Sequence, residues 1–232
     1  MNFSIYPCFK WPGTIWFYSD PHFSDADLYQ YRGMSVEDGD ALQVKRINSR
    51  VAKGDTIVFL GDIGNTDIMK KIKGYKVLIQ GNHDSGASNY LRVVKTAASN
   101  AINNVSEVVV TDNRLFDEVY DGTLQISSKI LLSHEPVDYK YCLNIHGHDH
   151  SGSGFIKQLT ADYGCDIPTA DLNMAQLKTA VRYNLKALNM CAEWLGYYPI
   201  ALSQIAKSGI LKNIPDIHRD TIDTATARRL KN

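Results

Sequence analysis

Residues 76–84 read KVLIQGNHD, and this stretch decides the fold because it joins a strand pattern directly to a cluster of polar side chains. The apolar run KVLI has the length and character of a buried strand. The residues after it, Gly81-Asn82-His83-Asp84, include groups that bind metal ions or move protons. The stretch therefore predicts a strand whose carboxyl end is followed by residues that bind metal ions or transfer protons.

Four other strand-like runs end in the same way. TIWFY (14–18) precedes Ser19-Asp20-Pro21-His22, TIVFL (56–60) precedes Gly61-Asp62, KILLS (129–133) precedes His134, and YCLNI (141–145) precedes His146-Gly147-His148-Asp149-His150. Open α/β sheets place their sites just beyond the carboxyl ends of strands. We therefore expect residues far apart in the sequence to converge on one crevice.

The residue types in these clusters suit divalent metal ions. Imidazoles and carboxylates match manganese, iron or zinc, and the clusters hold no thiolate, which argues against a structural zinc site. Two cooperating ions need a shared ligand, and Asp62 can serve because a carboxylate bridges ions roughly 3.5–4 Å apart. Gly61, Gly81 and Gly147 each precede a proposed ligand, where a tight turn or a close backbone approach leaves no room for a side chain.

Taken in chain order, D-x-H, G-D, G-N-H-D, a lone His and G-H-x-H resemble the motif set of the calcineurin-like metallophosphoesterases, over about residues 14–150. The stretch YPIALSQI (198–205) is similar to the closing segment of small bacterial and phage members. Together with the mixed order of strands and helices, the resemblance implies an α/β fold: a two-sheet β-sandwich with helices on both outer faces. We expect residues 1–232 to form a single domain.

The resemblance also implies roles for individual residues. Asp20, His22 and His150 would hold one metal ion, Asn82, His134 and His148 the other, and Asp62 would bridge them. A hydroxide between the ions would attack phosphorus. Asn82 and His83 would contact the substrate, and His83, oriented by Asp84, would protonate the leaving oxygen as the catalytic acid. Manganese is the ion expected to support activity best, with iron or zinc as alternatives.

Departures from the family pattern narrow the expected activity. Asn65 stands where many members have a second aspartate, Asp84 stands where protein phosphatases have Glu, and their signature arginine is missing. A phosphodiesterase, nuclease or nucleotide phosphatase is therefore favoured over a phosphoprotein phosphatase, with diesters preferred to monoesters. The alternative is a non-catalytic metal-binding interaction scaffold on the same fold, and the presence of His83 argues against it.

The rest of the chain predicts further elements. Helices are expected at about 36–52 (with Ser35 and Asp38 in capping-box spacing), 66–73, 89–94 and 171–187, and strands at 107–111, 118–122 and 123–127, the last in a hairpin with KILLS. Residues 151–189 interrupt the alternation of strands and helices. They predict an inserted cap that could restrict access to the metals. The polar tail 216–232 predicts a solvated terminus.

Composition argues against two classes of protein, those that attract polyanions by their overall charge and those that span a membrane. Lys+Arg and Asp+Glu both count 25, so no global charge attracts a polyanion, and no apolar run approaches a membrane span. Four cysteines without a C-x-x-C pair, and no secretory pattern, favour reduced thiols in the cytoplasm of a bacterial or phage-infected cell. The expected partner is a small phosphate ester, a nucleotide or a short nucleic acid, with no membrane; the oligomeric state stays open.

Several other side chains are predicted to be structural. Cys142 and Cys191 lie in apolar runs and are expected in the core. His146 falls outside the ligand pattern and is expected to be a hydrogen-bonded structural histidine. Trp194, Tyr197 and Tyr198 could stack on a base, and the core is the favoured interpretation.

Overall fold

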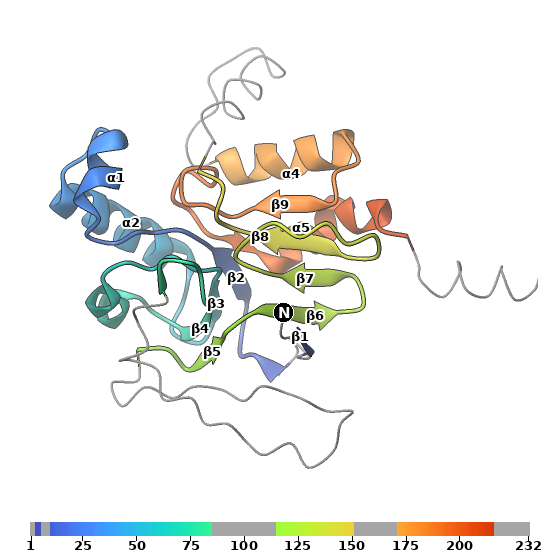
Figure 1. Cartoon of the computed structure of the whole chain (residues 1–232), viewed down its shortest axis with the longest axis horizontal. Coiled ribbons are helices and arrows are strands. Elements are labelled where there is room, and N and C mark those ends of the chain that lie inside the picture. Colours follow the sequence, from blue (N-terminus) through green and yellow to red (C-terminus); the bar gives the residue numbers. More distant parts are fainter. Residues whose placement is uncertain (1–2, 6–9, 85–114, 151–170, 216–232) are drawn as a thin grey trace, which may run out of the picture.

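The described residues form two five-stranded sheets with helices packed against them, as the sequence predicts in outline (Figure 1). The computed structural model describes residues 3–5, 10–84, 115–150 and 171–215. Both sheets contain parallel and antiparallel pairs, so the predicted mixed α/β class is confirmed.

The first sheet carries the strands that precede the D-x-H, G-D and G-N-H-D motifs. Its strands, in spatial order, are β10 (Ile200–Ala201), β2 (Ile15–Tyr18), β3 (Thr56–Phe59), β4 (Tyr75–Ile79) and β5 (Glu118–Tyr120). Strands β2 to β5 are parallel, and Phe59 pairs with Tyr18 on one side and Leu78 on the other. The carboxyl ends of β2, β3 and β4 therefore lie level at one edge.

The second sheet carries the strands before His134 and the G-H-x-H motif. Its strands, in spatial order, are β1 (Phe3–Ile5), β6 (Thr123–Ser127), β7 (Ile130–Leu132), β8 (Leu143–His146) and β9 (Ala187–Asn189). The predicted hairpin of β6 and β7 is confirmed, with a register shift between Gln125 and Ser127. Strands β7, β8 and β9 are parallel, so their carboxyl ends also share an edge.

The two carboxyl edges meet. An isolated parallel bridge joins Ser19, just after β2, to Cys191, just after β9. A single cluster of buried side chains includes Phe17 and Ile57 from the first sheet and Leu132 and Ile145 from the second. One shared core therefore holds the two edges together, and the loops beyond them face a common space.

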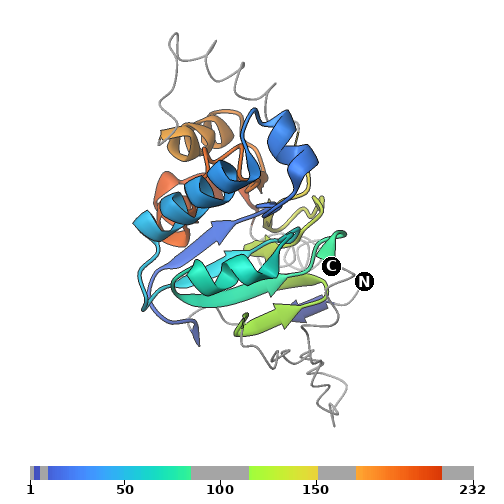
Figure 2. The same cartoon turned by 90° about the vertical axis from the view of Figure 1, so that its left-hand side faces the viewer.

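Helices α1 (Ala26–Tyr31) and α2 (Val36–Arg50) connect β2 to β3. The predicted cap of α2 is present, since the Ser35 hydroxyl accepts a hydrogen bond from the Asp38 N–H at 3.1 Å. The expected helix at 66–73 is a 3₁₀ helix, η2 (Thr66–Lys71), and Gly74 follows it in a left-handed conformation (φ +91°). Helix α2 contacts η2, and Figure 2 shows both on the side of the first sheet that faces the viewer.

The C-terminal part of the described chain belongs to the sheets and the core. Helix α4 (Leu172–Arg182) packs on β9, on α5 (Leu202–Ser208) and on η5 (Ile210–Asn213), and α5 packs on β2. The helix expected at 171–187 thus ends at Arg182, and β9 then adds a strand to the second sheet. Residues 172–189 of the expected cap therefore form part of the fold, and the cap stays a prediction for residues 151–170.

Several expectations fall outside the described residues. They are the helix at 89–94, the strand at 107–111, the first part of the cap at 151–170 and the tail at 216–232. Within the described residues, Cys142 and Cys191 are buried, which confirms their place in the core. No helix of these residues combines the length and the apolar character needed to cross a bilayer.

Candidate metal centre

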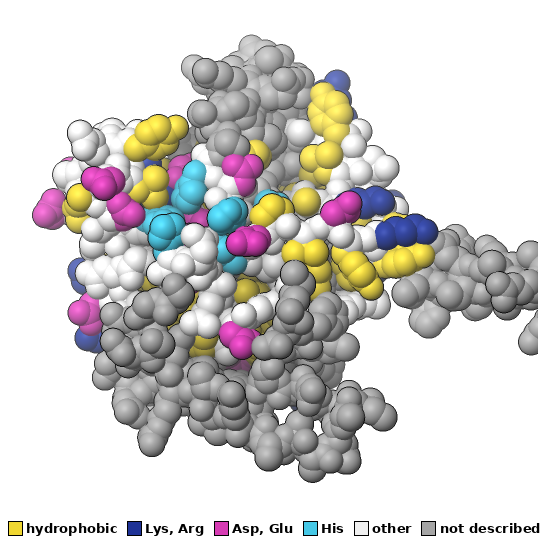
Figure 3. All heavy atoms as spheres, in the orientation of Figure 1, with side chains coloured by type: hydrophobic (Ala, Val, Ile, Leu, Met, Phe, Trp, Pro, Cys, Tyr) yellow, Lys and Arg dark blue, Asp and Glu magenta, His cyan; other side chains and the backbone are white. Residues whose placement is uncertain are grey.

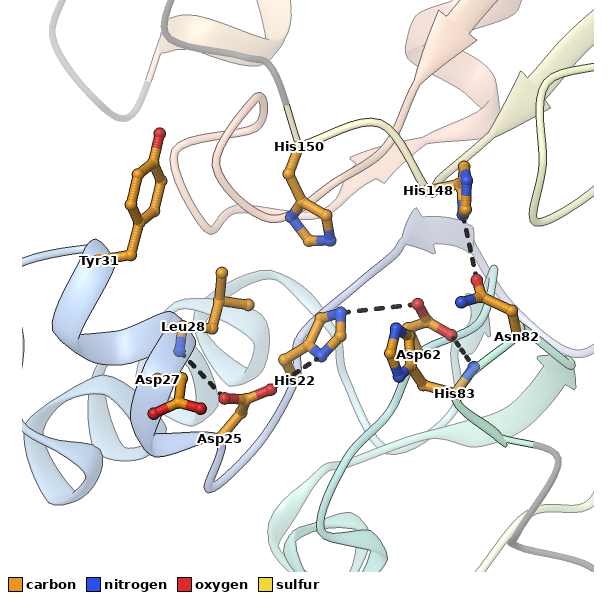
Figure 4. Close-up of a pocket in the computed structure, with 10 residues that line it drawn as sticks. All are labelled: His22, Asp25, Asp27, Leu28, Tyr31, Asp62, Asn82, His83, His148 and His150. Atoms are coloured by element: carbon orange, nitrogen blue, oxygen red, sulfur yellow. Dashed lines mark hydrogen bonds and ion pairs between the residues drawn. The ribbon is translucent and has the colours of Figure 1, made fainter.

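All seven predicted metal ligands lie around one space at the joined edges of the two sheets, and Figure 4 shows five of them with His83 beside them. Asp20, His22, Asp62 and His134 are buried, with Asp20 fully inaccessible. Asp20, His22, Asp62 and His148 have positive φ angles of 45–69°. Such a conformation costs a non-glycine residue about 1–3 kcal/mol and clusters at functional sites. The strained turns direct these side chains into the shared space.

A first cluster consists of Asp20, His22 and His150. One ligand atom from each lies within 4.8 Å of the others. The His150 Nε2 atom is 3.5 Å from Asp20 Oδ1. This is the trio that the resemblance implies for one ion.

A second cluster consists of Asp20, Asp62 and His134, again within 4.8 Å of one another. His134 Nε2 lies 2.7 Å from the Asn82 side-chain oxygen, and His148 Nδ1 lies 3.1 Å from the same oxygen. Asn82, His134 and His148, the trio implied for the other ion, therefore stand together. Asp20 adds a carboxylate that is common to both clusters.

Asp62 belongs to the second cluster and also faces the first. Its Oδ2 atom is 3.6 Å from His22 Nε2 and 3.5 Å from His134 Nε2. One carboxylate oxygen thus faces a histidine of each cluster, which is the position that a bridging ligand needs.

Acceptor oxygens lie beside the Nδ1 atoms of three histidines and favour the proton on that nitrogen. The Nδ1 atom of His22 lies 3.4 Å from Asp25 Oδ2, that of His150 lies 3.2 Å from Glu193 Oε1, and that of His134 lies 2.7 Å from the Leu60 carbonyl. Carboxylate and carbonyl oxygens only accept, so Nδ1 donates in all three imidazoles. In His22 and His150 the Nε2 atom is then left with a lone pair, the form that binds a metal, whereas His134 Nε2 lies 2.7 Å from the Asn82 side-chain oxygen.

These lone pairs face carboxylate oxygens, which are also electron-rich. The Nε2–oxygen separations of 3.5–3.6 Å exceed those of hydrogen bonds, and His22 Nε2 is buried with no hydrogen-bond partner among the described residues. Two atoms each about 2.1 Å from one ion would lie roughly 3.0–3.4 Å apart, close to the observed spacing. The nitrogen and oxygen donor set therefore fits divalent cations.

The pKa values reflect the surroundings of each group. Burial lowers the pKa of His22 and so favours its neutral form. The hydrogen bond to Glu193 raises the pKa of His150 despite its burial. Burial would raise the pKa of Glu193, but the hydrogen bond from His150 and the charge of Arg32 outweigh burial and hold that pKa below its usual value.

Two glycines are required by close backbone approach, as predicted. A Cβ atom on Gly147 would collide with the Ser19 and Asp20 side chains, and one on Gly81 would collide with the Asp62 carboxylate. Any side chain at these positions would push a proposed ligand aside.

The two predicted catalytic residues lie at different depths. His83 is exposed, its ring lines the cleft 5.4 Å from the His22 ring, and its backbone N–H donates to Asp62 Oδ1 at 2.9 Å. Asp84 is buried, and its carboxylate accepts from the N–H groups of Gly81, Asp62 and Ile63 at 2.8–3.0 Å. These contacts place Asp84 as a support of the Asp62 turn, and its orientation of His83 stays a prediction.

Sequence reasoning missed the residues that hold the ligands. Glu193 binds His150 and receives the Arg32 Nε–H at 2.7 Å, and the Cys191 thiol donates to Asp20 Oδ2 at 3.1 Å. The sequence also did not predict the role of Asp25, which follows His22 by three residues, lies beside its ring and caps α1. A charged residue inside the apolar run LNMCAEW was the signal that could have pointed to Glu193.

Other predicted side chains have structural contacts. His146 is buried, its Nδ1 lies 2.8 Å from the Gly147 carbonyl, and burial lowers its pKa. The side chain of Asn65 caps η2 by accepting from the Asp67 N–H. Tyr197 packs against the core, as expected, and also under the guanidinium groups of Arg32 and Arg46.

The clusters open into a cleft of about 500 Å³. The described residues that line it are His22, Asp25, Asp27, Leu28, Tyr31, Asp62, Asn82, His83, His148 and His150. In the space-filling view of Figure 3, histidine side chains gather on one face with acidic side chains around them. The proposed ligands are thus open to solvent on one side.

Comparison with protein-family models and with curated proteins finds no match. Among solved structures, a protein of unknown function, AQ665 from Aquifex aeolicus, is 22% identical, with 84% of this chain and 98% of that chain covered and a TM-score of 0.51. At this identity the likeness shows the fold alone. The nuclease MPE from Pseudomonas putida is 20% identical, with 59% of this chain and 61% of that chain covered, but its TM-score of 0.36 is too low to carry an argument.

Proposed function

We propose that this protein is a metal-dependent phosphoesterase of the calcineurin-like type, which hydrolyses phosphate esters and prefers diesters. The proposal includes the two-sheet sandwich of that family, with helices on both outer faces. The observation that carries it is the convergence of the Nε2 atoms of His22, His134 and His150 on the buried carboxylates of Asp20 and Asp62, with His22 Nε2 buried and without a hydrogen-bond partner among the described residues. Divalent cations between these atoms would satisfy the buried His22 Nε2 atom and offset the charge of the two buried carboxylates.

Two divalent ions fit the proposed site. Asp20, His22 and His150 would hold one, Asn82, His134 and His148 the other, and Asp62 both. When bound, the ions would supply an activated water and would polarise the phosphoryl oxygens. Manganese is expected to support activity best, with iron or zinc as alternatives.

The chain's own residues would position the ester and move a proton. Asn82 and His83 both line the cleft, and we infer that they contact the phosphoryl group. His83 would give its proton to the leaving oxygen. Asp84 would help by fixing the backbone of Gly81 and Asp62, so that the His83 N–H keeps its bond to Asp62 Oδ1.

The test is metal analysis combined with a substrate panel. The protein is stripped with a chelator, reloaded with Mn²⁺, Fe²⁺ or Zn²⁺, and its metal content is measured by mass spectrometry. Each form is assayed on bis-para-nitrophenyl phosphate, para-nitrophenyl phosphate, cyclic nucleotides and oligonucleotides. We expect two ions per chain and metal-dependent turnover that is fastest on the diester.

The same experiment separates the proposal from its alternative. Fewer than one Mn²⁺ per chain after reloading would refute the dinuclear site. Two ions per chain with no turnover on any substrate would support a non-catalytic metal-binding scaffold. Robust cleavage of long duplex DNA would identify a nuclease rather than an enzyme for small esters.

A further inference from the structure

Helix α1 forms the wall of the cleft that faces the metal ligands. Asp25, Asp27, Leu28 and Tyr31, from its cap to its last residue, line the same 500 Å³ space as His22 and His150. In Figure 4, Tyr31 and Leu28 stand on one side of the opening and His150 stands on the other. An ester held at the ligands would therefore have α1 beside its organic substituent.

Two side chains give this wall an apolar and aromatic surface. Leu28 and Tyr31 are three residues apart, so they occupy one face of the helix. Tyr31 is 75% exposed, and Leu28 is half-buried below it. A single exposed tyrosine is ordinary on a protein surface. Its place above Leu28, at the mouth of a cleft lined by proposed metal ligands, is what indicates a binding role.

The charges on the wall are acidic. None of the described residues that line the cleft is Lys or Arg. Asp25 is engaged by His22 and by the Leu28 N–H, whereas Asp27 is exposed at the rim. A second phosphate on the substrate would meet the Asp27 carboxylate without a compensating cation among these residues. The cleft therefore favours esters with one phosphate.

Hydrogen bonds hold α1, the wall of the cleft, against the turn that carries the proposed ligands Asp20 and His22. Arg32, directly after α1, donates to the backbone carbonyls of Asp20 and Pro21 at 3.3 Å and pairs with Glu193. Beneath α1, the buried Gln43 amide donates to the Pro21 carbonyl and to the Tyr29 hydroxyl, both at 2.8 Å. These bonds tie α1 to the D-x-H turn, so its outer face is presented in a constant position.

From these contacts we propose that Tyr31 and Leu28 form a subsite for an aromatic ring, such as a nucleobase, on a phosphate ester that carries a single phosphate. Tyr31 stacks on the ring, and Asp27 disfavours a second phosphate. The inference rests on the proposed phosphoesterase function and adds the class of substrate to it.

The first test compares two diesters with the same leaving group. The subsite is tested with the substituent that stays on phosphorus: thymidine 5′-(4-nitrophenyl phosphate) carries a base there, and methyl 4-nitrophenyl phosphate carries only a methyl group. With the Mn²⁺-loaded protein, Tyr31→Ala should lower kcat/KM for the thymidine ester about 5- to 10-fold, the lower range for loss of base stacking, and leave the methyl ester unchanged. Tyr31→Phe should keep the wild-type ratio. Tyr139→Ala, at a 45% exposed tyrosine that is not among the described lining residues, is the matched control.

A binding measurement gives a readout independent of turnover. Phenylphosphonate and methylphosphonate, which are not hydrolysed, are titrated calorimetrically into the Mn²⁺-loaded protein. The phenyl compound should bind more tightly to the wild type, and Tyr31→Ala should abolish the difference. Asp27→Asn should raise kcat/KM roughly two- to fivefold for the thymidine ester that also bears a 3′-phosphate.

The outcomes distinguish the two proposals. If neither diester is cleaved by the Mn²⁺-loaded wild type, the phosphoesterase function fails. If both are cleaved, but Tyr31→Ala leaves their ratio and the phosphonate affinities unchanged, the aromatic subsite is wrong while the enzymatic function stands.

Discussion

The two clusters of proposed metal ligands differ in what holds their histidines. In the second cluster, His134 is anchored by the backbone carbonyl of Leu60, which belongs to the same strand end as Asp62. In the first cluster, His22 and His150 are anchored by the carboxylates of Asp25 and Glu193. The backbone anchor is fixed by the sheet and is neutral, whereas the carboxylates add charge and depend on single side chains. The second cluster should therefore tolerate mutations around it better than the first.

The largest effect should come from Asp62, because this residue faces both clusters. We expect Asp62→Ala, and the isosteric Asp62→Asn, to lose both ions and to reduce turnover of bis-para-nitrophenyl phosphate to background, as metal removal does. Metal content and turnover are measured together, with circular dichroism to establish folding. Asp67→Ala, at an exposed acid on η2, is the control. Full activity in a folded Asp62 variant would show that the clusters do not share this ligand.

His83 belongs to neither cluster, so its removal should separate chemistry from metal binding. His83→Ala is expected to keep two ions and to lose about 10²–10⁴-fold in kcat, the usual contribution of a general acid. Metal analysis and steady-state kinetics on the diester check this outcome. If the variant also loses an ion, His83 must be counted among the ligands.

Breaking the buried pair of Arg32 and Glu193, which supports the first cluster, should lower the free energy of unfolding. Arg32 has a side chain only 2% exposed, and it pairs with Glu193, whose side chain is 16% exposed. Arg32→Met would leave Glu193 buried without its cation, which should destabilise the protein by about 3–5 kcal/mol in urea unfolding. Lys70→Met removes the partner of Asp67 in a pair whose side chains are 63% and 71% exposed, and should cost about 0–1 kcal/mol.

The same pair gives stability a pH dependence of definite sign. Because the folded-state pKa of Glu193 lies below its ordinary value of 4.5, its contribution is present above that pH. The contribution is lost as the pH falls through the lower folded pKa. Acid unfolding of metal-free protein should therefore show a smaller loss of stability in Glu193→Gln than in the wild type. If the wild type and Glu193→Gln lose the same stability as the pH falls, the pair adds nothing to stability.

The smallest effect should be confined to one metal site. Glu193→Ala removes the anchor of His150 and should weaken one of two Mn²⁺ sites about 10- to 100-fold, as loss of a partner behind a ligand typically does. Glu193→Gln keeps an accepting oxygen, so its weakening of the Mn²⁺ site should lie at the lower end of this range. Calorimetric Mn²⁺ titration should show one binding phase shifted and the other unchanged. Equal weakening of both phases would contradict the independence of the two anchors.

The order of strands and of ligand motifs could be predicted from the sequence because both are local. Asp20, Asp62, Asn82 and His134 each follow an apolar run within a few residues, and parallel strands bring their carboxyl ends to one edge. The strained backbone at Asp20 and Asp62 then directs these two side chains into the shared space. The order of strand-like and helical segments, together with the family resemblance, predicted the α/β class, and the strand pattern alone predicted the β6–β7 hairpin.

What the sequence determined by itself was therefore which polar side chains follow the strand ends, whereas the tertiary structure decided which residues hold them in place. Glu193 lies 43 residues from His150 and 161 residues from Arg32, and nothing local predicts that the three meet. The same holds for residues 172–189, whose pattern predicted a cap but whose strand β9 completes the second sheet. A strand end is marked by a short apolar run, but contacts between distant segments arise only when one hydrophobic core has brought them together.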